Sequence, residues 1–159
     1  MVTPENSLFK FCFYSFFLSL IFFLNACLGL THKHRINVHI QAARYLNPDV
    51  QGEASPVGLT FYELKNNTLF DKVAFFKLQD GSIEALQGTL IDQRSFMIRP
   101  EEQLNFKYLL SSDARYLGVV VAYRHLTFSE WKKIVTLNAK TIKRINIVLG
   151  SNSFMINTP

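Results

Sequence analysis

Apolar and polar residues alternate over several short stretches of this chain. Residues 36–41 and 57–62 place apolar side chains at every second position, which indicates strands with one buried and one exposed face. Residues 117–123 are almost continuously apolar, as in a strand buried on both faces in the middle of a sheet. Further strands are predicted at 95–98, 104–108, 131–137 and 144–149. About seven strands joined by short turns predict an all-β fold, a two-sheet antiparallel β-sandwich.

Two segments break the alternation. Between residues 70 and 88, Phe70, Val73 and Ala74 fall at helical spacing, and the polar tripeptide at 80–82 should interrupt the helical pattern. One or two short helices are therefore predicted as a small helical insertion. The polar stretch 47–56 contains two prolines and a glycine, which predicts a loop between the first two strands.

The N-terminal segment has the features of a signal for export. The apolar run 11–24 follows Lys10 and spans about 21 Å as a helix, short of the roughly 30 Å hydrocarbon core. It ends in Leu24-Asn25-Ala26-Cys27, which resembles the lipobox of bacterial lipoproteins. This predicts a signal peptide at 1–26 that is removed, a lipidated Cys27 with a tether at 27–35, and a sandwich domain at 36–159.

A rival interpretation leaves the leader in place. If the apolar run extends to Leu30, it just reaches the length of an uncleaved membrane anchor. Lys33 and Arg35 follow the run and would tend to keep that side cytoplasmic. The other cysteine, Cys12, lies inside the leader, so the mature domain would form no internal disulfide. The preference for cleavage depends on the small residue directly before Cys27.

Charge narrows the choice of partners. The chain has a formal net charge of +5, and the basic residues are scattered instead of forming a stripe with aromatic partners, as nucleic-acid binding would need. No nucleic-acid partner is expected. An anionic lipid surface or an acidic protein surface fits the charge better.

Candidate chemistry is sparse. Two groups of reactive residue types occur: His32, His34 and His39 near the predicted tether, and His125, Ser129 and Glu130 after the buried strand. The first group has no cysteine or carboxylate at metal-ligand spacing. The second has no nucleophile-elbow pattern and no identifiable orienting group. We therefore expect no catalytic residues, no metal, no cofactor and no small-molecule substrate.

Several blocks of sequence carry a resemblance to a known family. They are residues 42–49 (AARYLNPD), 55–65 (SPVGLTFYELK), 70–74, 116–124 (YLGVVVAYR) and Trp131. In this order, behind a lipobox, they resemble the outer-membrane lipoproteins of type VI secretion systems, the TssJ family, also called SciN or VasD. The blocks cover most of residues 24–140. The chain departs from the family at 58–60, where a valine–arginine pair is usual, and at Asn25 in the lipobox.

The resemblance implies a transthyretin-like sandwich that acts as a scaffold. Family members are anchored in the outer membrane, at its periplasmic face, and bind the periplasmic region of an inner-membrane partner, TssM. Leu28 is not the aspartate associated with inner-membrane retention, which favours outer-membrane delivery. The competing hypothesis is a ligand-binding or enzymatic envelope lipoprotein unrelated to secretion.

The loop between the first two strands is the predicted partner contact. It carries two acidic groups on a basic domain, and flanking prolines limit its freedom, so it should lose less entropy on docking. The predicted contact residues are Asn47, Pro48, Asp49, Gln51, Glu53 and Ser55. A sheet edge or the helical insertion at 70–86 is the alternative location.

Overall fold

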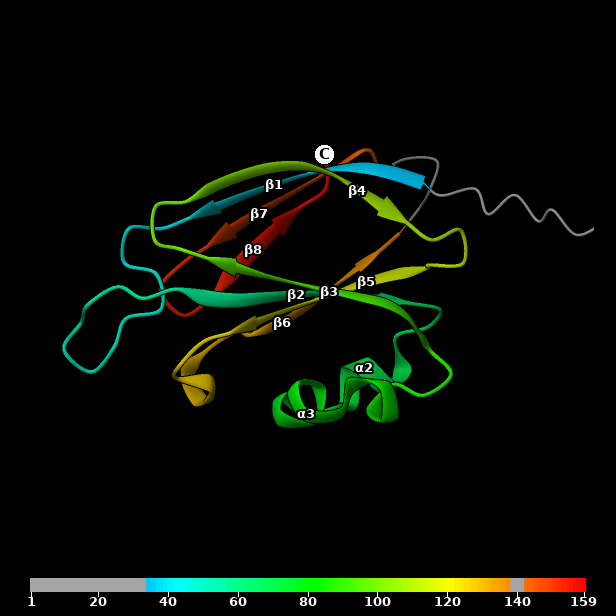
Figure 1. Ribbon diagram of the computed structural model, residues 1–159, viewed down its shortest axis with the longest axis horizontal. Helices are drawn as coiled ribbons and strands as arrows, with labels where there is room; N and C mark the ends of the chain where they lie inside the picture. Colours follow the sequence, from blue (N-terminus) through cyan, green and yellow to red (C-terminus); the bar gives the residue numbers. More distant parts are fainter. Residues whose placement is uncertain (1–33, 138–141) are drawn as a thin grey trace, which may run out of the picture. The chain divides into compact units, whose positions relative to one another are not determined.

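Eight strands form two four-stranded sheets that face each other (Figure 1). The computed structural model describes residues 34–137 and 142–159, so the leader, Cys27 and His32 lie outside the described residues. The first sheet has the order β4-β1-β7-β8 and the second β3-β2-β5-β6. The strands are β1 His34–Ala42, β2 Val57–Leu64, β3 Leu90–Ile98, β4 Gln103–Leu110, β5 Tyr116–Ala122, β6 Lys132–Thr136, β7 Arg144–Leu149 and β8 Phe154–Asn157.

The two-sheet sandwich is confirmed, with differences in detail. β1 and β7 pair in parallel, whereas every other pair of neighbouring strands is antiparallel. β8, a four-residue strand paired with β7, was not predicted. β1 begins at His34 because His34 and Arg35, assigned to the tether from the sequence, pair with the end of β4.

The main core lies between the sheets and follows the predicted alternation. Ile36, Val38 and Ile40 of β1 are buried to 1% exposure or less. From the opposite sheet, the Phe61 ring meets Tyr108 edge-on at a centroid distance of 5.4 Å. Packing of alternate side chains from two facing sheets is the usual core of a β-sandwich.

A second core explains the continuous apolar run of β5. The helices α2 Thr68–Lys72 and α3 Phe75–Ala85 cover the outer face of the second sheet (Figure 1). Their buried residues pack against Tyr62 of β2 and Val120 of β5, so these strands are buried on both faces. The predicted break at 80–82 is wrong, because those residues lie within α3. Among the described residues, no helix is long and apolar enough to cross a membrane.

Two contacts attach the helices to the sheet. Gly118 gives the Phe70 ring room, since a Cβ built at Gly118 would lie 2.5–2.8 Å from its ring carbons. The Lys132 ammonium donates hydrogen bonds to three backbone carbonyls at the end of α2, those of Phe70, Asp71 and Val73, at 2.8, 2.9 and 3.1 Å. A cation at a helix C-terminus satisfies carbonyls that have no helical partner.

Candidate partner-binding surface

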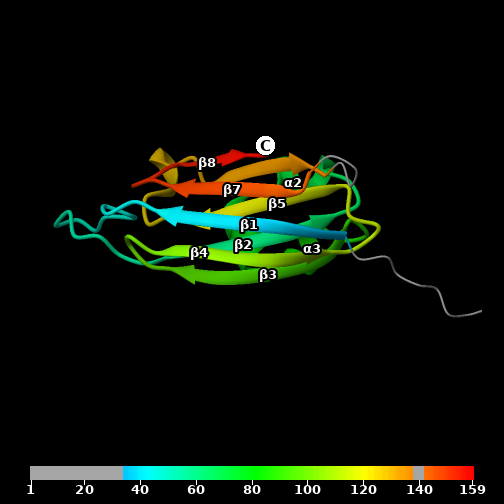
Figure 2. The same cartoon turned by 90° about the horizontal axis from the view of Figure 1, so that it is seen from above.

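Four connections gather at one end of the sandwich. The register pairs Ala42 with Leu149 in the first sheet and Gly58 with Ala122 in the second. The Arg124 N–H donates to Asn47 Oδ1, so the loops that leave the two sheets at these points meet. This loop end comprises residues 43–56, 99–102, 123–131 and 150–153. Figure 2 shows it opposite the point where β1 begins.

Asn47 connects three of these loops from a buried position. The residue is 4% exposed, and its φ of 45° lies in the left-handed region, which asparagine tolerates better than most residues. Its Nδ2 donates to the Pro56 carbonyl at 2.9 Å, and its Oδ1 accepts from the backbone N–H of Arg124 at 2.8 Å. Its own N–H donates to the Ser151 carbonyl at 3.0 Å. Asn47 therefore positions the loops and does not present its side chain to a partner.

Ser55 closes the base of the loop opposite Asn47. The Ser55 hydroxyl donates to the Asn47 carbonyl and accepts from Nε of Arg124 at 3.1 Å. The Ser55 N–H donates to the Leu46 carbonyl at 2.9 Å. Ser55, like Asn47, uses its polar atoms inside the domain.

Asp49 folds the tip of the loop. Its Oδ1 accepts hydrogen bonds from the N–H groups of Gln51 and Glu53, both at 2.9 Å. The backbone adds a bond from the Asp49 N–H to the Glu53 carbonyl at 2.9 Å and one from Gly52 back to Asp49 at 3.0 Å. Gly52 has a φ of 85°, which a residue without a Cβ adopts freely. The tip is therefore a turn that is held by hydrogen bonds within the loop and is ordered without a partner.

The turn presents a small set of exposed side chains. Gln51 and Glu53 are exposed, as predicted for contact residues, and Val50 between the prolines is 83% exposed. Sequence reasoning missed Val50 and also Phe128, which is 81% exposed in the short 3-10 helix Leu126–Phe128 of the neighbouring loop. Both are apolar residues within segments that are otherwise typical of polar loops, and this feature of the sequence could have identified them.

A shallow hollow lies beside this turn. It has a volume of about 380 Å³ and is lined by residues of three loops, among them Pro48, Phe128 and Asn152. Tyr123 forms part of its wall, and its hydroxyl donates to the Ser153 carbonyl at 2.8 Å. Burial, with a smaller contribution from Glu130, raises the pKa of the Tyr123 phenol. Tyr123 therefore stays neutral near neutral pH and holds two loops together.

The other candidate groups make separate contacts within the described part of the chain. The Ser129 hydroxyl donates to the backbone carbonyl of His125 at 2.6 Å, and the Glu130 carboxylate pairs with Lys133. Neither contact links nucleophile, base and acid in a relay. His39 hydrogen-bonds Asn105 at 2.6 Å on the outer face of the first sheet, and His34 contacts the Ile142 carbonyl at 3.1 Å. Within residues 34–137 and 142–159, no three metal-ligating side chains come together.

Two facing sheets with an ordered, partly apolar loop end define a domain of the β-sandwich class. The sequence profile of the type VI secretion lipoprotein family, which covers VasD, EvfM and TssJ, matches residues 34–152. The chain belongs to this family, whose members are structural lipoproteins and not enzymes. No curated protein sequence matches the chain.

Solved structures share the fold. The crystal structure of the T6SS lipoprotein TssJ1 from Pseudomonas aeruginosa is 32% identical, with a TM-score of 0.77 over 80% of this chain and 97% of that chain. Serratia marcescens Lip, a membrane-bound component of the type VI secretion system, is 22% identical, with a TM-score of 0.72 over 80% and 98% of the two chains. A chain of a type VI membrane complex is 22% identical, with a TM-score of 0.69 over 78% and 98%.

Proposed function

We propose that this protein is a lipid-anchored scaffold of a type VI secretion membrane complex. Its loop end would bind the periplasmic region of a TssM-type inner-membrane protein, as the family resemblance implies. The observation that carries this proposal is the turn built by Asp49, which is ordered by its own hydrogen bonds. A binding loop that is already ordered loses less conformational entropy on association.

The position of the loop end suits this role. β1 runs from the side of the proposed anchor toward the loop end over nine residues, about 30 Å at roughly 3.3 Å per residue. The loop end is therefore separated from the proposed anchor by the full length of β1. This separation leaves the loop end available to a partner that reaches from the other membrane.

The anchor itself is proposed at Cys27. Residues 1–26 would be removed, and the acylated cysteine would hold the protein at the periplasmic face of the outer membrane. Intact-mass analysis of the wild type and of Cys27→Ser tests acylation and cleavage together. An unmodified wild type that retains residues 1–26 would instead support the uncleaved anchor. Density-gradient fractionation tests the outer-membrane location, and recovery with inner-membrane vesicles would reject it.

Loop replacement tests the partner contact. Because Asn47 and Ser55 hold the fold together, only residues 48–53 should be exchanged for glycine and serine. We expect calorimetry against the periplasmic region of the partner to show no measurable binding, while the unfolding transition stays cooperative. Phe76→Ser is the matched surface control, because Phe76 is 67% exposed on the helical insertion, away from the loops.

The outcomes separate the possible interfaces. Retained affinity in the loop replacement would exclude the proposed contact. Loss of affinity in Phe76→Ser would move the contact to the helical insertion. Phe128→Ser should also weaken binding, since Phe128 is exposed and shares the hollow with Pro48, and exposed apolar groups beside a polar loop are common anchors in interfaces.

A further inference from the structure

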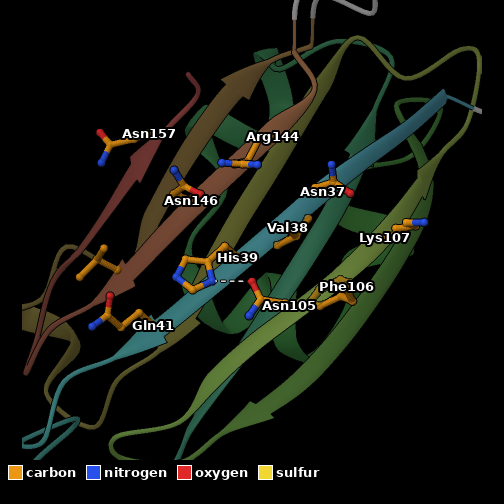
Figure 3. Close-up of a pocket in the computed structure, with 11 residues that line it drawn as sticks. Asn37, Val38, His39, Gln41, Asn105, Phe106, Lys107, Arg144, Asn146 and Asn157 are labelled. Atoms are coloured by element: carbon orange, nitrogen blue, oxygen red, sulfur yellow. Dashed lines mark hydrogen bonds between the residues drawn. The ribbon is translucent and has the colours of Figure 1, made fainter.

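No described helix covers the outer face of the first sheet, and the four strands of this sheet carry no acid. The helices lie on the other sheet (Figure 1), so the outward side chains of β4, β1, β7 and β8 line an open hollow of about 990 Å³ (Figure 3). Its polar lining is mainly amides: Asn37, Gln41, Asn105, Asn146 and Asn157. Among the described residues of these four strands, no Asp or Glu occurs.

Three cations gather at one end of this face. Lys107 and Arg144 flank Asn37 on the two neighbouring strands, so their Cα atoms lie about 10 Å apart. Arg35 is two residues from Asn37 along β1 and therefore points to the same face. All three are exposed. We call Arg35, Lys107 and Arg144 the cationic patch.

The cationic patch lies at the end of the sandwich where β1 begins. Figure 3 shows Arg144 and Lys107 on either side of β1 toward that end, with His39 and Gln41 farther along. The opposite, loop end carries five acids, Asp49, Glu53, Glu101, Glu102 and Glu130, and three arginines, Arg44, Arg99 and Arg124. The end of this face where β1 begins is therefore basic, whereas the acids of the loop end outnumber its arginines.

The tether limits how far the patch can move from an anchored membrane. Six residues separate Cys27 from His34, so even a fully extended chain of seven steps spans only about 25 Å. A folded domain held this closely brings its basic end repeatedly within a Debye length, about 8 Å, of the headgroups. Anionic lipids attract Lys and Arg at such distances, and each of these side chains raises the partition coefficient of the protein onto the membrane by about fivefold.

We propose that the cationic patch binds the anionic phospholipid headgroups of the membrane that holds the anchor. This inference rests on the anchoring at Cys27 that the proposed function includes. The contact supplies a second attachment beside the acyl chains, and membrane proteins with two such signals are held more stably than those with one. It also orients the sandwich so that the loop end points away from the lipid.

Vesicle binding of the unlipidated domain tests the patch alone. A protein comprising residues 28–159 is suitable, because 80% of this chain already covers 97% of the crystallised Pseudomonas aeruginosa relative. Co-sedimentation would use vesicles of phosphatidylcholine and of phosphatidylcholine with about 30% phosphatidylglycerol, at low and high salt. We expect binding only to the anionic vesicles, and loss of binding at high salt.

A matched pair of variants makes the test specific. Arg35→Gln/Lys107→Gln/Arg144→Gln should lower the partition coefficient by about 100-fold, from three contributions of about fivefold. Arg44→Gln/Lys77→Gln/Arg99→Gln removes the same charge from exposed residues outside the patch and should lower it by less than about fivefold. Urea unfolding of both variants checks that each is folded.

Three results would overturn the proposal. They are equal losses in the two variants, no binding of the wild type to anionic vesicles, or a patch variant that keeps its vesicle binding and loses affinity for the inner-membrane partner. The last result would make the patch a protein-docking surface. The vesicle measurement needs neither acylation nor the partner. A negative result would therefore reject the lipid contact and leave the scaffold function untouched. Likewise, evidence against the scaffold function would not alter the vesicle result.

Discussion

Replacing Asp49 with alanine should weaken partner binding more than removing an equal charge nearby. The Asp49 carboxylate accepts two backbone hydrogen bonds that fold the tip of the loop. Alanine removes both, whereas Asp49→Asn keeps an oxygen in the same place without the charge. Glu53→Gln removes one negative charge and leaves the Glu53 N–H bond to Asp49 in place. The three variants therefore separate loop order from charge.

The magnitude follows from the hydrogen bonds. Each of the two hydrogen bonds to the Asp49 carboxylate contributes about 1 kcal/mol at this half-exposed site. Asp49→Ala therefore lowers the stability of the ordered turn by about 2 kcal/mol. If the partner binds only the ordered turn, the apparent Kd rises by up to about 30-fold. Neutral acceptors form bonds about half as strong as charged ones, which gives about fivefold for Asp49→Asn. Glu53→Gln should change Kd by about twofold, because an exposed charge pair contributes at most about 1 kcal/mol.

Calorimetry of each variant against the partner's periplasmic region measures these ratios. Urea unfolding should show little change in global stability, because the turn lies outside both cores. The reasoning is refuted if Asp49→Ala and Glu53→Gln have the same effect, since charge alone would then account for both. It is refuted equally if Asp49→Ala binds as tightly as the wild type.

Three further predictions concern stability, each measured by urea unfolding. Lys132→Met should lower the unfolding free energy by about 2–3 kcal/mol, because three carbonyls of the α2 end lose a charged donor; a change below about 0.5 kcal/mol would show that water replaces the ammonium. Gly118→Ala should cost about 1–3 kcal/mol through overlap with the aromatic ring of α2, whereas Gly58→Ala, whose Cβ would lie 3.6 Å from its nearest neighbour, should be tolerated. Burial raises the pKa values of Tyr108 and Tyr123 above their usual 10.0, so above pH 10 the unfolded chain releases phenol protons that the folded protein keeps. Stability should therefore fall as the pH rises from 9 to 11, and removing one phenol with Tyr123→Phe should reduce that slope by up to about 1.4 kcal/mol per pH unit; a flat profile would contradict this.

Much of the sandwich was predictable because alternation records which face of a strand is buried. The period of two in β1 and the continuous apolar run of β5 correspond directly to one and two covered faces. β8 escaped prediction because four residues are too few to show a period. Asp80-Gly81-Ser82 was expected to end a helix, yet α3 continues through it, since local propensity is weaker than the packing of a helix on a sheet.

The sequence identified the loop that forms the candidate surface, but not which of its side chains are buried and which are exposed. Prolines, glycine and acids identified the loop, and they do not reveal that Asn47 and Ser55 turn inward while Val50 and Phe128 remain exposed. That distinction depends on Arg124, which is 77 residues from Asn47 in sequence and donates to it.

The sequence by itself determined the strand positions, the acid loop, the net charge and the lipobox prediction, because each is a local pattern. Only the tertiary structure decided the parallel pairing of β1 with β7 and the gathering of Arg35, Lys107 and Arg144 on one face. These depend on which strands become neighbours, and neighbours in a sheet are chosen by long-range pairing that no local period encodes.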